Sequence, residues 1–116
     1  MAIEVLFASV PVADLRKAIP WYEALFGRSA DIVPNQNELM WRMTGNGWIY
    51  VIGDTKRAGG TVVTIAVNDL EQLVTDLADR GISPGQIVAV GDAGRRADVV
   101  DPDGNVLSWI QVTNSH

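Results

Sequence analysis

The sequence of 116 residues contains no cysteine, and its only histidine, His116, is the last residue. The absence of cysteine excludes disulfide bonds, thiolate nucleophiles and cysteine-ligated metals. Most transition-metal sites in enzymes need imidazole or thiolate ligands. A metal site in this chain would therefore have to be built from carboxylate and carbonyl oxygens.

Basic charge and long apolar runs are also scarce. The 9 Lys and Arg residues are outnumbered by 14 Asp and Glu residues, which gives a net charge of −5. Such a chain lacks the basic surface with which proteins bind nucleic acid or anionic membranes. It also lacks an apolar run of membrane-spanning length and the pattern of a secretion signal. We therefore expect a cytoplasmic protein with no nucleic-acid or membrane partner.

The composition that remains indicates a folded domain. Hydrophobic residues make up 47% of the chain and charged residues 20%, which is typical of globular rather than disordered proteins. A chain of this length can bury one core. We therefore expect a single domain over residues 1–116.

The sequence contains two similar halves. In the first, a β-branched stretch (IEVLFASVPV, 3–12) precedes Asp14 as a helix cap, an amphipathic segment at 15–27 and Gly27 as a helix stop. In the second, TVVTIAVNDL at 61–70 leads into another amphipathic segment that stops at Gly81. A pattern seen twice indicates a duplicated supersecondary unit. We place the modules at about 1–57 and 61–113, with a linker near 58–60.

Each half continues with strand-like segments. The tetrapeptide Thr44-Gly45-Asn46-Gly47 is a hairpin signal between two such segments. Each half therefore has the order strand, helix, strand, strand, strand, which predicts an α+β fold with helices on one side of mostly antiparallel sheets. The later strand segments are 29–34, 38–43 and 48–53 in the first half, and 86–92, 96–101 and 105–112 in the second.

These motifs in this order resemble the vicinal oxygen chelate superfamily, which includes glyoxalase I, extradiol dioxygenases and bleomycin resistance proteins. The resemblance implies two βαβββ modules whose curved sheets form a cup, with helices on the outer side, usually in a homodimer. It does not specify an activity, because one scaffold hosts many chemistries. The matching motifs are Val12-Ala13-Asp14-Leu15, Trp21-Tyr22, Leu25-Phe26-Gly27, Val67-Asn68-Asp69-Leu70 and Asp101-Pro102-Asp103-Gly104-Asn105.

The resemblance also implies four positions at which metal-dependent members carry His, Glu or Gln. Spacing from the motifs places these positions at Phe7, Tyr50, Val62 and Ser108. The set offers one phenol and one hydroxyl, both protonated at neutral pH. A transition metal needs three or four convergent donors. We therefore expect a cup with no metal and no cofactor.

Strand alternation indicates which side chains of the first half would line the cup. The first strand would present Phe7 and Ser9. A two-residue turn at Gly45-Asn46 would align the hairpin so that both of its tryptophans share that face. The ligand-binding residues predicted from the first half are Phe7, Ser9, Trp41, Trp48 and Tyr50.

The second half would complete the lining with Val62 and Ser108, whereas Trp109 would lie on the opposite face as part of the core. The resulting surface is concave, aromatic and lightly polar. Such a surface suits a flat or greasy small molecule held by stacking.

Three functions are consistent with this cup. The first is a metal-free binding protein, a homodimer that holds an aromatic or amphipathic ligand. The second is an isomerase, lyase or epimerase in which Asp98 or Tyr50 replaces the metal, since a carboxylate in an apolar cup can serve as a general base or pair with a ligand cation. Asp98 would otherwise be a solvated strand-edge carboxylate. The third is a structural or interaction module, in which side chains or a partner subunit fill the cup.

Overall fold

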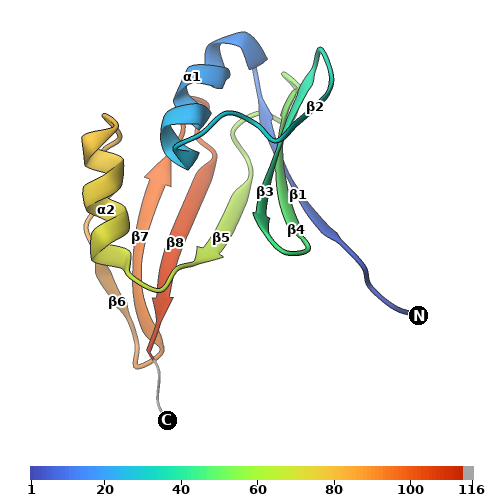
Figure 1. The fold of residues 1–116 in the computed structure, drawn as a ribbon. Coiled ribbons are helices and arrows are strands. Elements are labelled where there is room, and N and C mark those ends of the chain that lie inside the picture. Colours follow the sequence, from blue (N-terminus) through green and yellow to red (C-terminus); the bar gives the residue numbers. More distant parts are fainter. Residues whose placement is uncertain (114–116) are drawn as a thin grey trace.

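The structure, a computed structural model, describes residues 1–113, and His116 lies outside the described residues (Figure 1). Two modules repeat the order of one strand, one helix and three strands, which confirms the predicted α+β fold with two βαβββ modules. The first module contains β1 (Leu6–Val12), α1 (Leu15–Phe26), β2 (Ile32–Asn35), β3 (Glu38–Thr44) and β4 (Gly47–Gly53). The second contains β5 (Val62–Ala66), α2 (Leu70–Asp79), β6 (Val88–Val90), β7 (Gly94–Val100) and β8 (Val106–Val112).

Each module forms its own four-stranded mixed sheet. The strand order is β1-β4-β3-β2 in the first, called sheet 1, and β5-β8-β7-β6 in the second, called sheet 2. The first strand of each module pairs in parallel with the last, and the other pairs are antiparallel. β1 and β5 therefore each stand at the edge of a sheet.

Both helices are capped by an aspartate, as the sequence predicts for Asp14. The Asp14 carboxylate accepts a hydrogen bond from the Lys17 amide at 3.4 Å, and the Asp69 carboxylate accepts one from the Gln72 amide at 3.1 Å. Gly27 ends α1 with φ of 74°, a left-handed conformation that glycine adopts without steric cost. Neither helix in the described residues is long and apolar enough to cross a membrane.

The two modules share one core. The helix-covered faces of both sheets contribute to it, and Tyr22 of α1 links the modules, because its hydroxyl donates to Asp101 after β7 at 2.6 Å. The side-chain amide of Asn105 donates to the Pro11 carbonyl at 2.7 Å. The buried strand residues are Val10, Val12, Leu39, Trp41, Ile49 and Val51 in sheet 1, and Ala97, Val99, Leu107 and Trp109 in sheet 2.

The other face of each sheet is not covered by α1 or α2, and we call it the open face. Leu6 and Ala8 of sheet 1 look across a shallow cleft at Val63 and Ile65 of sheet 2. Alternation places these four side chains on the helix-covered faces. The helix-covered faces of the two sheets therefore face each other, and the open faces point outward. Figure 1 shows the two sheets diverging from each other.

The β3–β4 hairpin has a different register from the predicted one. Thr44 pairs with Gly47, as a two-residue turn requires, but Arg42 rather than Met43 pairs with Trp48. Met43 is thus the extra residue of a β-bulge, which shifts the pairing by one position. Because side chains alternate with a period of two, the shift exchanges the faces of β3 relative to β4.

Candidate functional site

An aromatic cluster lies on the open face of sheet 1, formed by Phe7 of β1 with Trp48 and Tyr50 of β4. The Phe7 and Trp48 rings stack with centroids 6.3 Å apart and an interplanar angle of 29°. Phe7 and Tyr50 meet edge to face at 6.5 Å. Phe7 is 50% exposed, although an aromatic ring gains free energy by leaving water. The cluster is therefore an accessible platform of rings.

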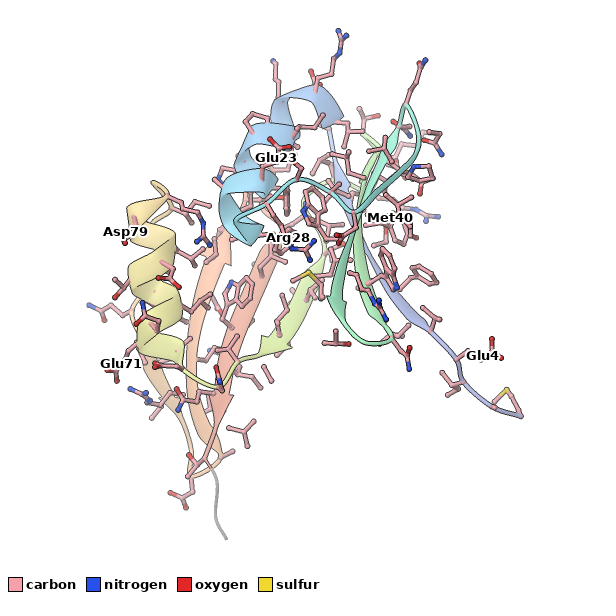
Figure 2. All side chains as sticks on the ribbon, in the orientation of Figure 1. Glu4, Glu23, Arg28, Met40, Glu71 and Asp79 are labelled. Carbon is pink, nitrogen blue, oxygen red and sulfur yellow. The ribbon has the colours of Figure 1, made fainter. Side chains whose placement is uncertain are left out.

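The strand register explains this cluster. Phe7 pairs directly with Trp48, and Ser9 pairs with Tyr50, so the three rings and the Ser9 hydroxyl share one face. Met40 of β3 pairs with Tyr50 and extends the apolar surface; its position beside the hairpin is labelled in Figure 2.

Charged groups on the open face of sheet 1 lie at its borders. The Arg42 guanidinium turns back to the hairpin, where its Nε donates to the Gly45 carbonyl at 3.0 Å. The Glu38 carboxylate accepts a hydrogen bond from the Asn35 side chain at 3.2 Å. The centre of this face is therefore apolar, with the Ser9 and Tyr50 hydroxyls as its polar groups.

The open face of sheet 2 carries a polar row instead of rings. Thr64 of β5 pairs with Ser108 of β8, and Ser108 pairs with Asp98 of β7. Ser108 is 5% exposed and lies on the floor of the row. The neighbouring row is apolar and consists of Val62, Val106 and Val100.

The Asp98 carboxylate is incompletely satisfied. Its Oδ1 atom is buried and accepts no hydrogen bond in the described part of the chain. The Arg96 Nε lies 3.6 Å away, beyond hydrogen-bond distance, and both side chains are more than 40% exposed. An ion pair of this kind contributes little, because water screens it. Asp98 therefore retains acceptor capacity on an accessible face.

The structure divides the predicted site residues into two groups. Phe7, Ser9, Trp48 and Tyr50 lie on the open face of sheet 1. Val62, Ser108 and Asp98 lie on the open face of sheet 2. Because the open faces are on the outside of the protein, one chain presents these residues on two separate surfaces.

Trp41 is the exception, because its predicted place on the cup face is wrong. Its side chain is fully buried, its indole N–H donates to the Arg28 carbonyl at 3.0 Å, and its ring lies 5.1 Å from that of Phe26. Figure 2 shows Arg28 beside the connection from α1 to sheet 1. The bulge at Met43 places Trp41 on the helix-covered face, where it fills the core.

Because of the same bulge, the sequence analysis did not predict that Met40 lies on the open face of sheet 1. The segment ELMWRM alternates Glu38, Met40 and Arg42 with Leu39, Trp41 and Met43. Two charged residues in the first set are typical of an accessible face, and three apolar residues in the second are typical of a core face. This contrast in polarity between the two sets predicts which face of β3 is buried, and it does so more reliably than the turn geometry.

The donor groups do not fit the metal centre that the resemblance implies. Phe7 and Val62 have no donor atom, and Tyr50 and Ser108 offer neutral hydroxyls. Within residues 1–113, no group of three or more His, Cys, Asp or Glu side chains is arranged to hold a metal ion. Asp98 adds a single carboxylate, fewer than the several oxygen ligands that even Ca²⁺ or Mg²⁺ takes.

Neither protein-family models nor curated proteins give a match to this sequence. The fold, in contrast, matches solved structures over nearly its whole length. A glyoxalase/bleomycin resistance protein from Catenulispora acidiphila DSM 44928 is 26% identical, with a TM-score of 0.89 over 96% of this chain and 100% of that chain. TnmS3, an antibiotic binding protein from Streptomyces sp. CB03234, is also 26% identical, with a TM-score of 0.79 over 97% of this chain and 99% of that chain.

A bleomycin-binding protein complexed with bleomycin is more distant in sequence. It is 17% identical, with a TM-score of 0.74 over 97% of this chain and 100% of that chain. The strand order, the two helix caps and these structural matches agree. The chain therefore has the glyoxalase/bleomycin resistance fold of the vicinal oxygen chelate superfamily.

Proposed function

We propose that this protein binds a flat, apolar small molecule against the Phe7, Trp48 and Tyr50 rings and does so without a metal. The observation that carries the proposal is the stacked, half-exposed ring cluster on a sheet face that neither helix covers. Stacking of a ligand ring on these side chains gives affinity without a specific set of polar contacts, because every planar aromatic ligand has a π-face. The Ser9 and Tyr50 hydroxyls can orient such a ligand.

Two of the similar structures support this reading. TnmS3 is an antibiotic binding protein, and another match was solved as a complex with bleomycin. Both hold the same arrangement of two βαβββ modules. Bleomycin is therefore the first antibiotic to test against this chain.

The site is completed, in our proposal, by a second copy of the chain. The open face of sheet 1 carries rings and that of sheet 2 a polar row, yet one chain does not bring the two together. β1 and β5 are unpaired on their outer edges, and Val62 and Val100 on the open face of sheet 2 are 68% and 58% exposed. Exposed edges and apolar patches of this kind mark interaction surfaces. A homodimer that joins sheet 1 of each copy to sheet 2 of the other creates two equivalent cups.

Calorimetric titration with bleomycin and with acridine, a neutral three-ring compound, tests the binding function. Trp48→Leu removes the ring that stacks on Phe7, and we expect a loss of affinity of about tenfold for acridine, since stacking on one aromatic side chain is worth about 1–3 kcal/mol. Trp21→Leu is the control, because it removes a tryptophan from α1, away from the open faces. Equal affinities for the two variants, or no binding of either compound to the wild-type protein, would contradict the proposal.

A metal-independent isomerase or lyase is the second candidate, and the partly satisfied Asp98 carboxylate next to Ser108 favours it. Such an enzyme would use Asp98 as the general base. Incubation with candidate compounds, followed by mass spectrometry, distinguishes the two functions. Product formation that Asp98→Asn abolishes supports the enzyme, and recovery of unchanged ligand supports the binding protein.

A further inference from the structure

The unbonded Asp98 oxygen needs a physical account, because buried polar atoms in folded proteins nearly always have a hydrogen-bond partner. Oδ1 of Asp98 is shielded from water and receives no hydrogen bond within residues 1–113. Leaving a buried acceptor unsatisfied costs free energy that a bound donor would recover. The carboxylate therefore favours a ligand that brings its own donor.

The surroundings of Asp98 restrict which donor fits. Its cross-strand neighbour Ser108 and the next residue in the row, Thr64, have neutral hydroxyls, and the flanking row of valines is apolar. Arg96 is the nearest cation, and it points its Nε at Oδ1 from 3.6 Å without a hydrogen bond. The Asp98 side chain as a whole is 42% exposed, so an N–H donor on a ligand can reach the carboxylate, displace the Arg96 guanidinium and form a charge-assisted hydrogen bond.

We propose that the cup selects ligands that combine a planar ring system with a protonated nitrogen, and that Asp98 accepts the hydrogen bond from this nitrogen. The inference rests on the proposed function. The rings that stack on the planar part of the ligand and the carboxylate that binds its nitrogen lie on different sheets, and they come together only in the proposed dimer. Ring stacking gives the affinity, and Asp98 gives the preference for a cation over a neutral or anionic analogue.

The chemistry of the row disfavours the other ligand classes. One carboxylate with two neutral hydroxyls is too small a donor set for a divalent cation. A ligand carboxylate or phosphate would be repelled by Asp98 at short range. Arg96, the guanidinium beside Asp98, could attract an anion, but its side chain is 46% exposed and screened by water.

Three probes of the same ring size test the proposal by calorimetry. At neutral pH, 9-aminoacridine is a cation, acridine is neutral and 9-anthracenecarboxylate is an anion. We expect the wild-type protein to bind 9-aminoacridine most tightly and the carboxylate most weakly. In Asp98→Asn the affinity for 9-aminoacridine should fall about tenfold, while that for acridine stays within about twofold.

The matched control is Asp79→Asn, which removes one negative charge from the exposed end of α2, labelled in Figure 2. This variant has the same net charge as Asp98→Asn, so it accounts for general attraction of cations to an acidic protein. We expect its affinities to match those of the wild type. An equal loss of 9-aminoacridine affinity in both variants, or no loss in either, would overturn the role of Asp98.

The outcomes also separate this inference from the function on which it rests. If acridine binds and Trp48→Leu weakens it, but the wild type shows no preference for 9-aminoacridine, the binding function stands and the cation preference is refuted. If none of the three probes binds, both proposals are refuted. Arg96→Gln is a second test of the role of Asp98. Removing the competing guanidinium should raise the affinity for 9-aminoacridine about twofold or more.

Discussion

Trp41 and Trp48 lie on adjacent strands of sheet 1 and differ in what surrounds them. Trp41 is fully buried and hydrogen-bonded, whereas Trp48 lies on the open face against Phe7. Replacing a large buried aromatic side chain by a small one leaves a cavity and typically costs about 3–5 kcal/mol. The same change on an accessible face loses much less, since the site stays in contact with water.

We therefore predict that Trp41→Leu lowers the free energy of unfolding by about 2–4 kcal/mol and that Trp48→Leu lowers it by less than about 1 kcal/mol. Urea unfolding followed by circular dichroism measures both values. Equal destabilisation by the two variants would show that the register of the β3–β4 hairpin differs from the one described.

Tyr22 is the residue through which pH should act on stability. Burial, with the hydrogen bond to Asp101 and the nearby negative charges, raises the pKa of the Tyr22 phenol far above its ordinary value of 10.0. Above that ordinary pKa the unfolded chain loses this proton and the folded protein keeps it. Each further pH unit should then remove about 1.4 kcal/mol of stability.

The measurement is the free energy of unfolding between about pH 9 and pH 11.5 for the wild type and Tyr22→Phe. The variant has no phenol proton at this position, so its stability should fall less steeply with pH by about 1.4 kcal/mol per unit above pH 10. Parallel slopes for the two proteins would rule out Tyr22 as the source of alkaline instability.

At the scale of elements, local signals predicted the helices well and the hairpin register poorly. Asp14, Asp69 and Gly27 act within one turn of their own helix, so their roles are readable from sequence alone. The bulge at Met43 depends on burying Trp41 against α1, which is a contact between distant parts of the chain. The turn residues Gly45-Asn46 do not predict this bulge, because tertiary packing determines the register of the hairpin.

The linker between the modules provides a prediction for an element. Gly59 adopts φ of +90°, and a Cβ at this position would overlap the Asp103 carbonyl oxygen in the turn before β8. The neighbouring Gly60 has room, with its nearest atom, the Arg57 carbonyl oxygen, at 3.9 Å. The linker thus packs tightly at one glycine and not at the other.

We predict that Gly59→Ala lowers the free energy of unfolding by about 2 kcal/mol or more, because both the left-handed φ and the close backbone approach resist a side chain. Gly60→Ala should change it by less than about 0.5 kcal/mol. Thermal unfolding of the two variants side by side provides the comparison. Similar melting temperatures for both would contradict the close approach of the linker to the Asp103 turn.

At the scale of the whole molecule, the repeat and its motifs were sufficient to predict two βαβββ modules. Spacing from the motifs placed Phe7, Val62 and Ser108, and alternation from Phe7 placed Ser9, on the faces that the structure leaves open. The relative placement of the two sheets could not be predicted, because it depends on long-range contacts such as Tyr22 with Asp101 and Asn105 with Pro11. The faces of most of these strand residues were thus predictable, but the separation of the two open faces from each other was not.

The central claim is that ligands bind on the ring-bearing open face of sheet 1 and not in the core. The chain has four tryptophans, and Trp48 is the one on that face, while Trp41 and Trp109 are buried and Trp21 lies on α1. Their four indole N–H signals can be followed separately by heteronuclear NMR during a titration with acridine. We predict that the Trp48 signal shifts progressively and saturates while the Trp41 and Trp109 signals stay nearly fixed. A saturating shift of Trp41 or Trp109 with an unmoved Trp48 signal would contradict the account.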